Sequence, residues 1–490
     1  MTDADWLNPS AIEEWWATPS QRGIKRPYSA DTVASLRDVF PENHHSNQMA
    51  LKLRGIFEKS QKEKTPNIAM NAVDAVAAEL MAEAGFETVY ISGERSVESK
   101  VAIDGLGLDS TDHTTFVPKK VATIHRSQLL HSRALRIKKS GPEDASLLPI
   151  IADAGSGQGQ HTAIMKLVKK LVQSGVAGFH LDDLLPGSGL RKHDSEDGNV
   201  TVVVPTNEYL RRLVSAKLQL DIMGSEVVSI ARTDAEIATH ITSTIDYRDR
   251  PFILGATVPM KKHYIHTEGN SDRAEWRREA KLKTLDEAFR SAQPNLYDQF
   301  IEQTKKTNVA EALAVARQLA PDFYFDYESP RTAEGWYAYK GGIDAAIARS
   351  NNAGFISSVV WACTHSYRAE SARRFASGVR AVHPGKWMAY NIAFDVGANR
   401  LSGEQTESLP QSLATMGYVW LFLPLSDLPT VGQDSKLAIK AIKEQGLSSY
   451  LHRVSTGEVR QHADGTNSEW WWKVMGKAAD QAADAIGRDL

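Results

Sequence analysis

The sequence predicts a TIM (β/α)8 barrel, on two observations. Short runs rich in β-branched and aromatic residues recur about eight times, and most of them are apolar on both faces, as in strands of a buried parallel sheet. Helical or irregular stretches separate these runs, and such strand–helix alternation is typical of the barrel. The predicted strands are residues 88–92, 147–153, 177–183, 227–234, 323–328, 358–363, 387–393 and 419–425.

The segment after the second run shows the pattern expected of a connecting helix. Ile164, Leu167, Val168 and Leu171 recur at the spacing that places them on one helical face, and Gly175 is a typical residue for a helix end. A doubly wound open sheet is the main alternative fold, but no G-x-G-x-x-G motif follows the first predicted strand. The barrel is therefore the preferred fold class.

The spacing of the strands also predicts five regions along the chain. A charged, partly helical stretch between the fourth and fifth runs is too long for a simple loop, so we expect it to form a subdomain. The predicted regions are 1–80 (N-terminal helical region without strands), 81–234 (first half of the barrel), 235–322 (helical insertion), 323–430 (second half of the barrel) and 431–490 (C-terminal helical region).

Length, charge and cysteine content narrow the class of protein. The 490 residues carry a net charge of −3, which gives no overall attraction to nucleic acid or anionic membranes. No apolar run approaches the ~20 residues that span a bilayer, and the acidic N-terminus lacks the layout of a signal peptide. The single cysteine, Cys363, excludes an internal disulfide. We expect a cytoplasmic protein whose partner is a small molecule.

Charged residues end neighbouring predicted strands, where a TIM barrel has its catalytic site. Asp153, Asp182 and Arg232 lie at the ends of three successive runs. The carboxylates could hold a hard divalent cation, and the arginine could bind a substrate carboxylate. The alternative is that these acids only cap helices or pair with basic neighbours. Further polar or small residues at predicted strand ends are Ser92, Gly93, Asp183, Glu328, Cys363 and Asn391.

Cys363 ends one predicted strand, and His365 follows it closely. A thiolate beside an imidazolium is an activated nucleophile, whereas a lone cysteine is more often a small apolar core residue. The sequence leaves both interpretations open.

Six segments of the chain match, in order, the motifs of one enzyme family. They are RGIKRPYSA (22–30), VYISG (89–93), PIIADAGSGQG (149–159), GFHLDD (178–183), a stretch that begins VSIARTD (228–257) and another that begins FYFDYESPR (323–342). On these segments the chain resembles the isocitrate lyase family of the isocitrate lyase and phosphoenolpyruvate mutase superfamily, and most closely its longer eukaryotic type.

The resemblance implies a TIM barrel with helices swapped between subunits of a homo-oligomer, a tetramer or a dimer. It also implies Mg²⁺-dependent cleavage of a carbon–carbon bond in a hydroxy-tricarboxylate. Asp153 corresponds to the family's principal magnesium aspartate, and Asp182 replaces a glutamate with a carboxylate of shorter reach. We therefore expect these two acids to bind Mg²⁺ or Mn²⁺. The expected substrate-binding residues are Ser92, Gly93, Arg232, Asn391 and Glu328.

Other positions depart from the family pattern. The family's mobile loop carries a cysteine that acts as the general acid, but the corresponding loop, 186–200, has none, and His193 is the candidate to replace it. Pro424 replaces a threonine, and Cys363 replaces a glutamate. Asp395 lies where serines bind a substrate carboxylate in the family, and its charge would repel a tricarboxylate.

We predict a divergent lyase that performs metal-assisted carbon–carbon cleavage, or a related hydrolysis or transfer, on a small oxo- or hydroxy-carboxylate other than isocitrate. The candidate catalytic residues are His193, Cys363 and Asp183. The alternative is a catalytically inactive pseudoenzyme that binds a ligand or acts as a regulatory partner subunit. Retention of Asp153 and Arg232 favours the enzyme, and the losses in the loop favour the pseudoenzyme.

Overall fold

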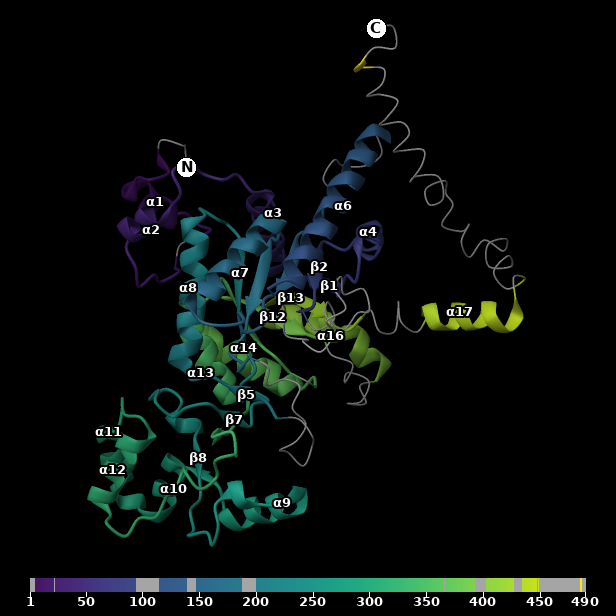
Figure 1. Cartoon of the computed structure of the whole chain (residues 1–490). Helices are drawn as coiled ribbons and strands as arrows, with labels where there is room; N and C mark the ends of the chain where they lie inside the picture. Colours follow the sequence, from purple (N-terminus) through teal and green to yellow (C-terminus); the bar gives the residue numbers. More distant parts are fainter. Residues whose placement is uncertain are drawn as a thin grey trace.

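A closed barrel of eight parallel strands forms the centre of the computed structural model (Figure 1). Neighbouring strands follow the order β1-β13-β12-β11-β6-β4-β3-β2, so the predicted TIM barrel is confirmed. The strands are β1 (Asn67–Asn71), β2 (Thr88–Ile91), β3 (Ile150–Asp153), β4 (Gly178–Leu181), β6 (Val228–Thr233), β11 (Val359–Ala362), β12 (Trp387–Asn391) and β13 (Tyr418–Leu423). The structure describes residues 5–21, 23–93, 114–138, 147–186, 200–364, 366–392, 402–426, 434–446, 448 and 485–486.

The sequence prediction is wrong for one of the eight strands. It misses β1, which lies within residues 1–80, because asparagines at both ends and partial exposure interrupt the apolar pattern. Residues 323–328 are not a barrel strand; they lie in the insertion, where Asp326 forms an isolated bridge with Ala256. Their two phenylalanines pack into the core of that insertion, which explains why the segment looks like a buried strand.

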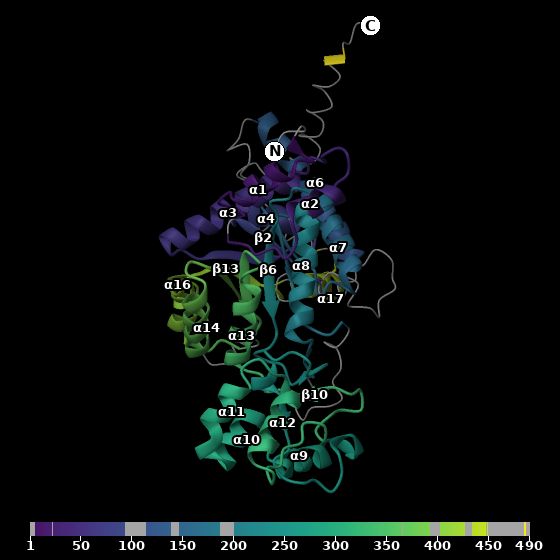
Figure 2. The same cartoon turned by 90° about the vertical axis from the view of Figure 1, so that its left-hand side faces the viewer.

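Helices surround the barrel and connect its strands (Figures 1 and 2). The predicted connecting helix is α7 (His161–Ser174): it buries Ile164 and Leu171 and ends at Gly175, whose φ of 97° is a conformation that favours glycine. Other helices outside the insertion are α1 (Pro9–Trp16), α2 (Ala30–Leu36), α3 (His45–Glu63), α4 (Ala75–Glu83), α6 (Phe116–Lys138), α8 (Thr206–Ile222), α13 (Ile343–Ala353), α14 (Ala369–Val382), α16 (Gly403–Met416) and α17 (Asp434–Gln445).

The connection from β6 to α13 forms an insertion subdomain at one end of the barrel (Figure 2). Its own core includes Phe289, Phe300 and Phe325. The subdomain begins after residue 234, and its core extends to Tyr339. Its elements are β7 (His240–Ile241), η3 (Arg250–Phe252), β8 (Leu254–Gly255), η4 (Tyr264–His266), α9 (Gly269–Ala280), β9 (Lys283–Thr284), α10 (Leu285–Ala292), η5 (Pro294–Leu296), α11 (Tyr297–Gln303), α12 (Val309–Leu319) and β10 (Tyr337–Ala338).

A three-stranded sheet joins this subdomain to the barrel. Its order is β10-β7-β5, and β5 (Val202–Val203) belongs to the connection between β4 and α8. The backbone N–H of Val204, just after β5, donates to the carbonyl of Asp183 at 2.8 Å. The subdomain is therefore hydrogen-bonded to the segment that follows β4.

A buried ion cluster holds the N-terminal segment against α8. The carboxylate of Asp221 accepts hydrogen bonds from Arg26 at 2.6 Å and from the Tyr28 hydroxyl at 2.8 Å, and it pairs with Lys217 at 2.7 Å. Arg37 donates to the Asp221 carbonyl at 2.8 Å. Two side chains of the RGIKRPYSA motif thus contribute to this packing. No helix in the described part of the chain combines the length and the apolar character needed to cross a bilayer.

Candidate active site

Three charged residues of the predicted site lie on neighbouring barrel strands. Asp153 ends β3, Asp182 comes directly after β4, and Arg232 lies near the end of β6. These strands are adjacent in the barrel, and parallel strands end at the same rim. The charges of Arg232 and Asp153 both act on the carboxyl of Asp182. The three side chains therefore share one electrostatic environment at the carboxyl ends of the strands.

Backbone donors orient Asp153. Its Oδ1 accepts a hydrogen bond from the N–H of Gly155 at 2.8 Å, and its Oδ2 accepts one from the N–H of Gly93 at 3.1 Å. The Nδ1 atom of His180 lies 3.6 Å from Oδ1. Gly93, predicted to bind substrate, here positions the carboxylate that is the first candidate metal ligand.

Asp182 is a buried carboxyl among charges of both signs. Burial raises its pKa to about 7, the charge of Arg232 opposes that rise, and the charges of Asp234 and Asp153 add to it. Its Oδ1 accepts a hydrogen bond from the N–H of Leu184 at 3.1 Å. A cation beside Asp182 would relieve the repulsion between these carboxylates and lower the pKa again.

Contacts on three sides hold Arg232 in place. Its Nε and Nη2 atoms donate to the two carboxylate oxygens of Asp234 at 2.8 and 2.9 Å. Its guanidinium lies over the ring of Trp361, 4.6 Å from the centroid, and Nη2 lies 3.6 Å from the Sγ of Cys363. The side chain is 17% exposed, so solvent reaches part of it.

The surroundings of Cys363 favour a neutral thiol. Burial raises the pKa of the thiol well above its ordinary value, Asp234 raises it further, and Arg232 acts in the opposite direction. The backbone N–H of Cys363 donates to the carbonyl of Thr233 at 2.9 Å. His365, the predicted activating partner, lies outside the described residues. This environment favours the interpretation of Cys363 as a buried core residue over the nucleophile.

Asp183 points away from Asp182 into a buried network. Its carboxylate accepts hydrogen bonds from the Thr233 hydroxyl at 2.6 Å, the N–H of Asp234 at 2.9 Å and the Nη1 of Arg349 at 3.1 Å. The residue is fully buried, and burial raises its pKa. These contacts support a positioning role and not the catalytic role predicted from the sequence.

Asn391 joins two barrel strands through its carboxamide. The Oδ1 accepts hydrogen bonds from the Nε1 of Trp361 at 2.9 Å and from the N–H of Thr364 at 3.2 Å, and the Nδ2 donates to the carbonyl of Thr364 at 2.7 Å. Among the described residues, only one hydrogen bond is donated by this amide nitrogen. Asn391 thus holds Thr364, just after β11, in place. Most of its carboxamide is used in these contacts, so little of it is left for the predicted substrate contact.

The remaining predicted residues have different placements. Ser92 follows β2 and is buried, in agreement with its expected position at a strand end. Glu328 is not at the end of a barrel strand; it lies in the insertion subdomain and accepts a hydrogen bond from Arg331 at 2.9 Å. His193 and Asp395 lie outside the described residues.

Sequence reasoning missed three aromatic residues that pack behind the acids. The Tyr90 hydroxyl lies 3.0 Å from the Nε2 of His180, whose other nitrogen faces Asp153. Trp361 meets His180 edge to face, with 5.0 Å between centroids. Each places an aromatic ring with a polar atom in a largely apolar strand, and that signal could have marked them as inward-facing supports of the site.

The two acids at the rim suit a hard divalent cation. Mg²⁺ prefers oxygen ligands, and it usually keeps several waters and takes only one or two protein carboxylates. Burial and the charge of Asp153 raise the pKa of Asp182, and a bound cation would lower that pKa again. Among the residues that the structure describes, no group of three or more His, Cys, Asp or Glu side chains is arranged to hold a metal. Asp153 and Asp182 would therefore hold the cation together with water or substrate oxygens.

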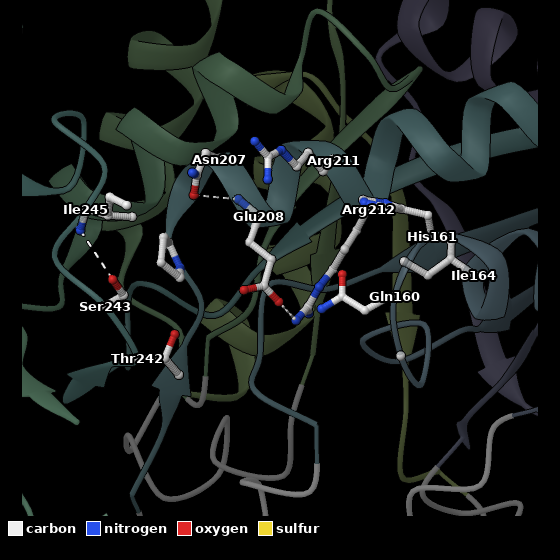
Figure 3. Close-up of a pocket in the computed structure, with 12 residues that line it drawn as sticks. Gln160, His161, Ile164, Asn207, Glu208, Arg211, Arg212, Thr242, Ser243 and Ile245 are labelled. Carbon is white, nitrogen blue, oxygen red and sulfur yellow. Dashed lines mark hydrogen bonds and ion pairs between the residues drawn. The ribbon is translucent and has the colours of Figure 1, made fainter. Parts of the chain in front are cut away.

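A separate cavity of about 270 Å³ lies where α7 and α8 begin (Figure 3). Arg212 lines it and pairs with Glu208 at 2.6 Å. The same guanidinium donates to the carbonyl of Leu184 at 2.8 Å, so it supports the segment that follows Asp182. The cavity is lined by residues other than the acids and the arginine of the candidate site.

The eight parallel strands, with two acids and an arginine near the carboxyl ends of three of them, are those of a TIM-barrel protein. The chain belongs to the isocitrate lyase family, whose model matches residues 8–475. It is 34% identical to the mitochondrial 2-methylisocitrate lyase of Schizosaccharomyces pombe, over 97% of this chain and 95% of the relative. It is 32% identical to the isocitrate lyase of Saccharomyces cerevisiae, over 96% and 90%. The structure of oxaloacetate acetylhydrolase with oxalate matches with a TM-score of 0.46 and 16% identity, over 91% of this chain and 100% of that chain.

Proposed function

We propose that the protein is a metal-dependent lyase that cleaves a carbon–carbon bond in a small oxo- or hydroxy-carboxylate other than isocitrate. The observation that carries this proposal is the common electrostatic environment of Asp153, Asp182 and Arg232 at the carboxyl ends of β3, β4 and β6. The match to a family of lyases over most of the chain supports the reaction class.

Each residue of the cluster has a separate task in this proposal. A bound Mg²⁺ or Mn²⁺ would polarise a substrate oxygen and stabilise enolate charge. Asp153 and Asp182 hold the cation, and the backbone N–H groups of Gly155 and Gly93 keep the first of these carboxylates in position. Arg232, whose side chain is 17% exposed, binds a substrate carboxylate, while Asp234 and the ring of Trp361 hold the guanidinium.

The proposed substrate differs from isocitrate because the sequence has lost groups that act on a tricarboxylate. The loop 186–200 contains no cysteine to protonate the departing carbanion, and Pro424 has no hydroxyl to bind a carboxylate. A smaller or less acidic carboxylate needs fewer such contacts. Relatives named 2-methylisocitrate lyase place that compound in the panel of substrates to be tested.

The proposal is tested by direct detection of cleavage products. The full-length protein is incubated with Mn²⁺ and a panel of 2-hydroxy- and 2-oxo-dicarboxylates and tricarboxylates, and carbonyl products are trapped and identified by mass spectrometry. We expect cleavage of at least one compound, its loss in Arg232→Met, and its retention in Arg374→Met, which removes an exposed arginine from α14. No product from any compound would sink the proposal.

A catalytically inactive ligand-binding or partner subunit is the second candidate. It is favoured by the loss of the loop cysteine and by the extent to which Asp234 and Cys363 already occupy Arg232. This candidate predicts no turnover with the panel. A homo-oligomeric state and a cytoplasmic location are further proposals, and relatives carrying "mitochondrial" in their names make the location worth testing by cell fractionation.

A further inference from the structure

Helix α8 directs two buried side chains toward the backbone that carries the candidate site. The hydroxyl of Tyr209, a fully buried residue, donates to the carbonyl of Arg232 at 2.7 Å. Three residues further on, Arg212 is 4% exposed. Its Nη1 donates to the carbonyl of Leu184 at 2.8 Å and lies 3.5 Å from that of Asp182. The first turns of α8 therefore contact the backbone of a candidate metal ligand and of the candidate carboxylate-binding residue.

Strand β5 holds the other side of the segment that follows β4. The N–H of Val204 donates to the carbonyl of Asp183 at 2.8 Å, and residues 184–185 also pair with β5. Arg212 takes the carbonyls on either side of Asp183. Successive carbonyls from 182 to 184 thus alternate between the arginine and β5. Contacts on both sides leave the backbone at Asp182 little freedom to move.

The backbone of this segment determines where the carboxylate of Asp182 points. Its Oδ1 accepts a hydrogen bond from the N–H of Leu184 at 3.1 Å, and Arg212 binds the carbonyl of the same residue. The N–H of Asp182 donates to the carbonyl of Gly155 at 2.9 Å, and the N–H of Gly155 donates to Asp153 at 2.8 Å. A shift of the segment after β4 would therefore move one acid relative to the other.

Glu208 keeps the guanidinium of Arg212 in this position. It lies one turn earlier on α8, and its Oε1 accepts a hydrogen bond from Nη2 at 2.6 Å, as Figure 3 shows. The side chain of Glu208 is 37% exposed, whereas that of Arg212 is 5% exposed. One nitrogen of the guanidinium is thus anchored to a carboxylate, and the other is directed to the backbone after β4.

We propose that Arg212 is a positioning residue of the candidate metal site, which fixes the segment after β4 so that Asp182 faces the same cation as Asp153. This inference rests on the proposed function, because it concerns the cation that the two acids would share. The effect of Arg212 passes through the carbonyls of residues 182 and 184, so the arginine is not itself a ligand. Groups that orient metal ligands typically contribute 10–100-fold to metal affinity.

Arg212→Lys separates positioning from charge. The charge of Arg212 acts on the carboxyl of Asp182, and lysine keeps that charge. Lysine replaces the planar fork of donors by a single ammonium group, which cannot bind Glu208 and the backbone carbonyls in the same geometry. If only the charge matters, Arg212→Lys should bind the cation as wild type does. If positioning matters, its affinity should lie between those of wild type and Arg212→Met.

Calorimetric titration of the full-length protein with Mn²⁺ tests the proposal in Arg212→Met and Arg212→Lys. Arg211→Met is the matched control, because it removes the neighbouring, exposed arginine of the same helix. Tyr209→Phe is a second control. It deletes a buried hydrogen bond from α8 to the barrel, but that bond ends at Arg232 and not in the segment of Asp182.

We expect Mn²⁺ to bind Arg212→Met about tenfold or more weakly than wild type, and to bind Arg212→Lys with intermediate affinity. Both controls should stay within about twofold of wild type. In the metal-free protein, the amides of residues 183–185 should exchange faster in Arg212→Met than in wild type, whereas those of β6 should not change. If Arg212→Met does not fold, Arg212→Lys decides the test, because it keeps the buried charge.

Three results would overturn the positioning role and leave the metal site in place. They are equal Mn²⁺ affinity in wild type and the Arg212 variants, wild-type affinity in Arg212→Lys beside a loss in Arg212→Met, and a loss of equal size in Tyr209→Phe. The last would show that the affinity depends on the packing of α8 in general. If wild type itself binds no Mn²⁺, the proposed metal site fails, and this inference fails with it.

Discussion

Arg349 and Asp183 form an ion pair that water does not reach: Nη1 and Oδ2 are 3.1 Å apart, and the side chains are 1% and 0% exposed. The Nη2 of the same guanidinium pairs with Asp249 at 2.8 Å, and Asp249 accepts two hydrogen bonds from Thr206 at the start of α8. Asp183 also binds the N–H of Asp234. One arginine thus joins α13, α8 and the strand that carries the candidate site.

The first prediction is that Arg349→Met strongly destabilises the protein. Removal of one partner from a buried ion pair leaves an uncompensated charge, so the free energy of unfolding should fall by about 3–5 kcal/mol. Urea denaturation followed by circular dichroism measures this change. Arg374→Met is the control, because its pair with Asp344 has side chains that are 50% and 69% exposed; it should cost less than about 1 kcal/mol. Similar losses in both variants would contradict the prediction.

The second prediction concerns the reactivity of Cys363. Because burial raises the pKa of its thiol, thiolate is scarce in the folded state at pH 8. A disulfide reagent such as DTNB should react at least about a hundredfold more slowly with native protein than with protein unfolded in urea. Cys363 is the only cysteine in the chain, so the colour change reports on it alone. Native and unfolded rates within a few fold of each other would restore the nucleophile hypothesis.

The barrel could be predicted because parallel strands buried on both faces leave continuous apolar runs in the sequence. The same rule missed β1 and wrongly assigned a barrel strand to residues 323–328. β1 is bounded by asparagines that bond to neighbouring strands, as Asn67 does with the Thr88 hydroxyl at 2.7 Å. The apolar residues of 323–328 are buried against helices of the insertion, which sequence alone cannot separate from burial in a barrel.

The candidate site was predictable for charged residues that lie at the ends of predicted strands. Asp153, Asp182 and Arg232 could be placed together because strands of a parallel barrel end at one rim. The tasks of Asp183 and Asn391 could not be predicted, since they depend on whether a side chain turns toward the rim or into hydrogen bonds with its neighbours. Asp183 turns to Arg349, which is 166 positions away in the chain, and no local pattern signals that contact.

The third prediction concerns the stability of the metal-free protein as a function of pH. Burial raises the pKa of Asp182 from 3.8 to about 7, so between these values the folded state binds more protons than the unfolded state. The stabilisation of the folded state by the protonated Asp182 carboxyl is complete below pH 4 and is lost as the pH rises through 7. In EDTA, wild type should therefore lose stability relative to Asp182→Asn between pH 4 and 8. If the free energies of unfolding of wild type and Asp182→Asn change equally with pH, the pKa of Asp182 is not raised.

The fourth prediction is that the protein releases no glyoxylate from isocitrate above background. The loop 186–200 has no cysteine to act as the general acid, and loss of a general acid typically costs 10²–10⁴ in rate. A coupled assay with Mg²⁺ measures glyoxylate, and the isocitrate lyase of Saccharomyces cerevisiae serves as the positive control. Turnover of about 1 s⁻¹ or faster, in the ordinary range of enzymes, would show that another residue replaces the cysteine.

The fifth prediction tests the metal site and separates the two candidate functions. Asp153 is fixed by two backbone N–H groups, and the negative charge of Asp153 raises the pKa of the neighbouring Asp182. A divalent cation that binds only the folded state stabilises it by RT ln(1 + [L]/Kd), about 2.7 kcal/mol at a hundredfold excess over Kd.

In a melting assay, millimolar Mg²⁺ or Mn²⁺ should raise the Tm of wild type by a few degrees. Asp153→Ala should abolish that rise, whereas Asp322→Ala, which removes an exposed acid from the insertion subdomain, should retain it. The metal-free Asp153→Ala protein should also show a lower pKa for Asp182, because a like charge beside that carboxyl has been removed. If wild type and Asp153→Ala melt alike with and without the cation, the acids at the rim bind no metal, and the inactive-subunit candidate becomes the better account of the chain.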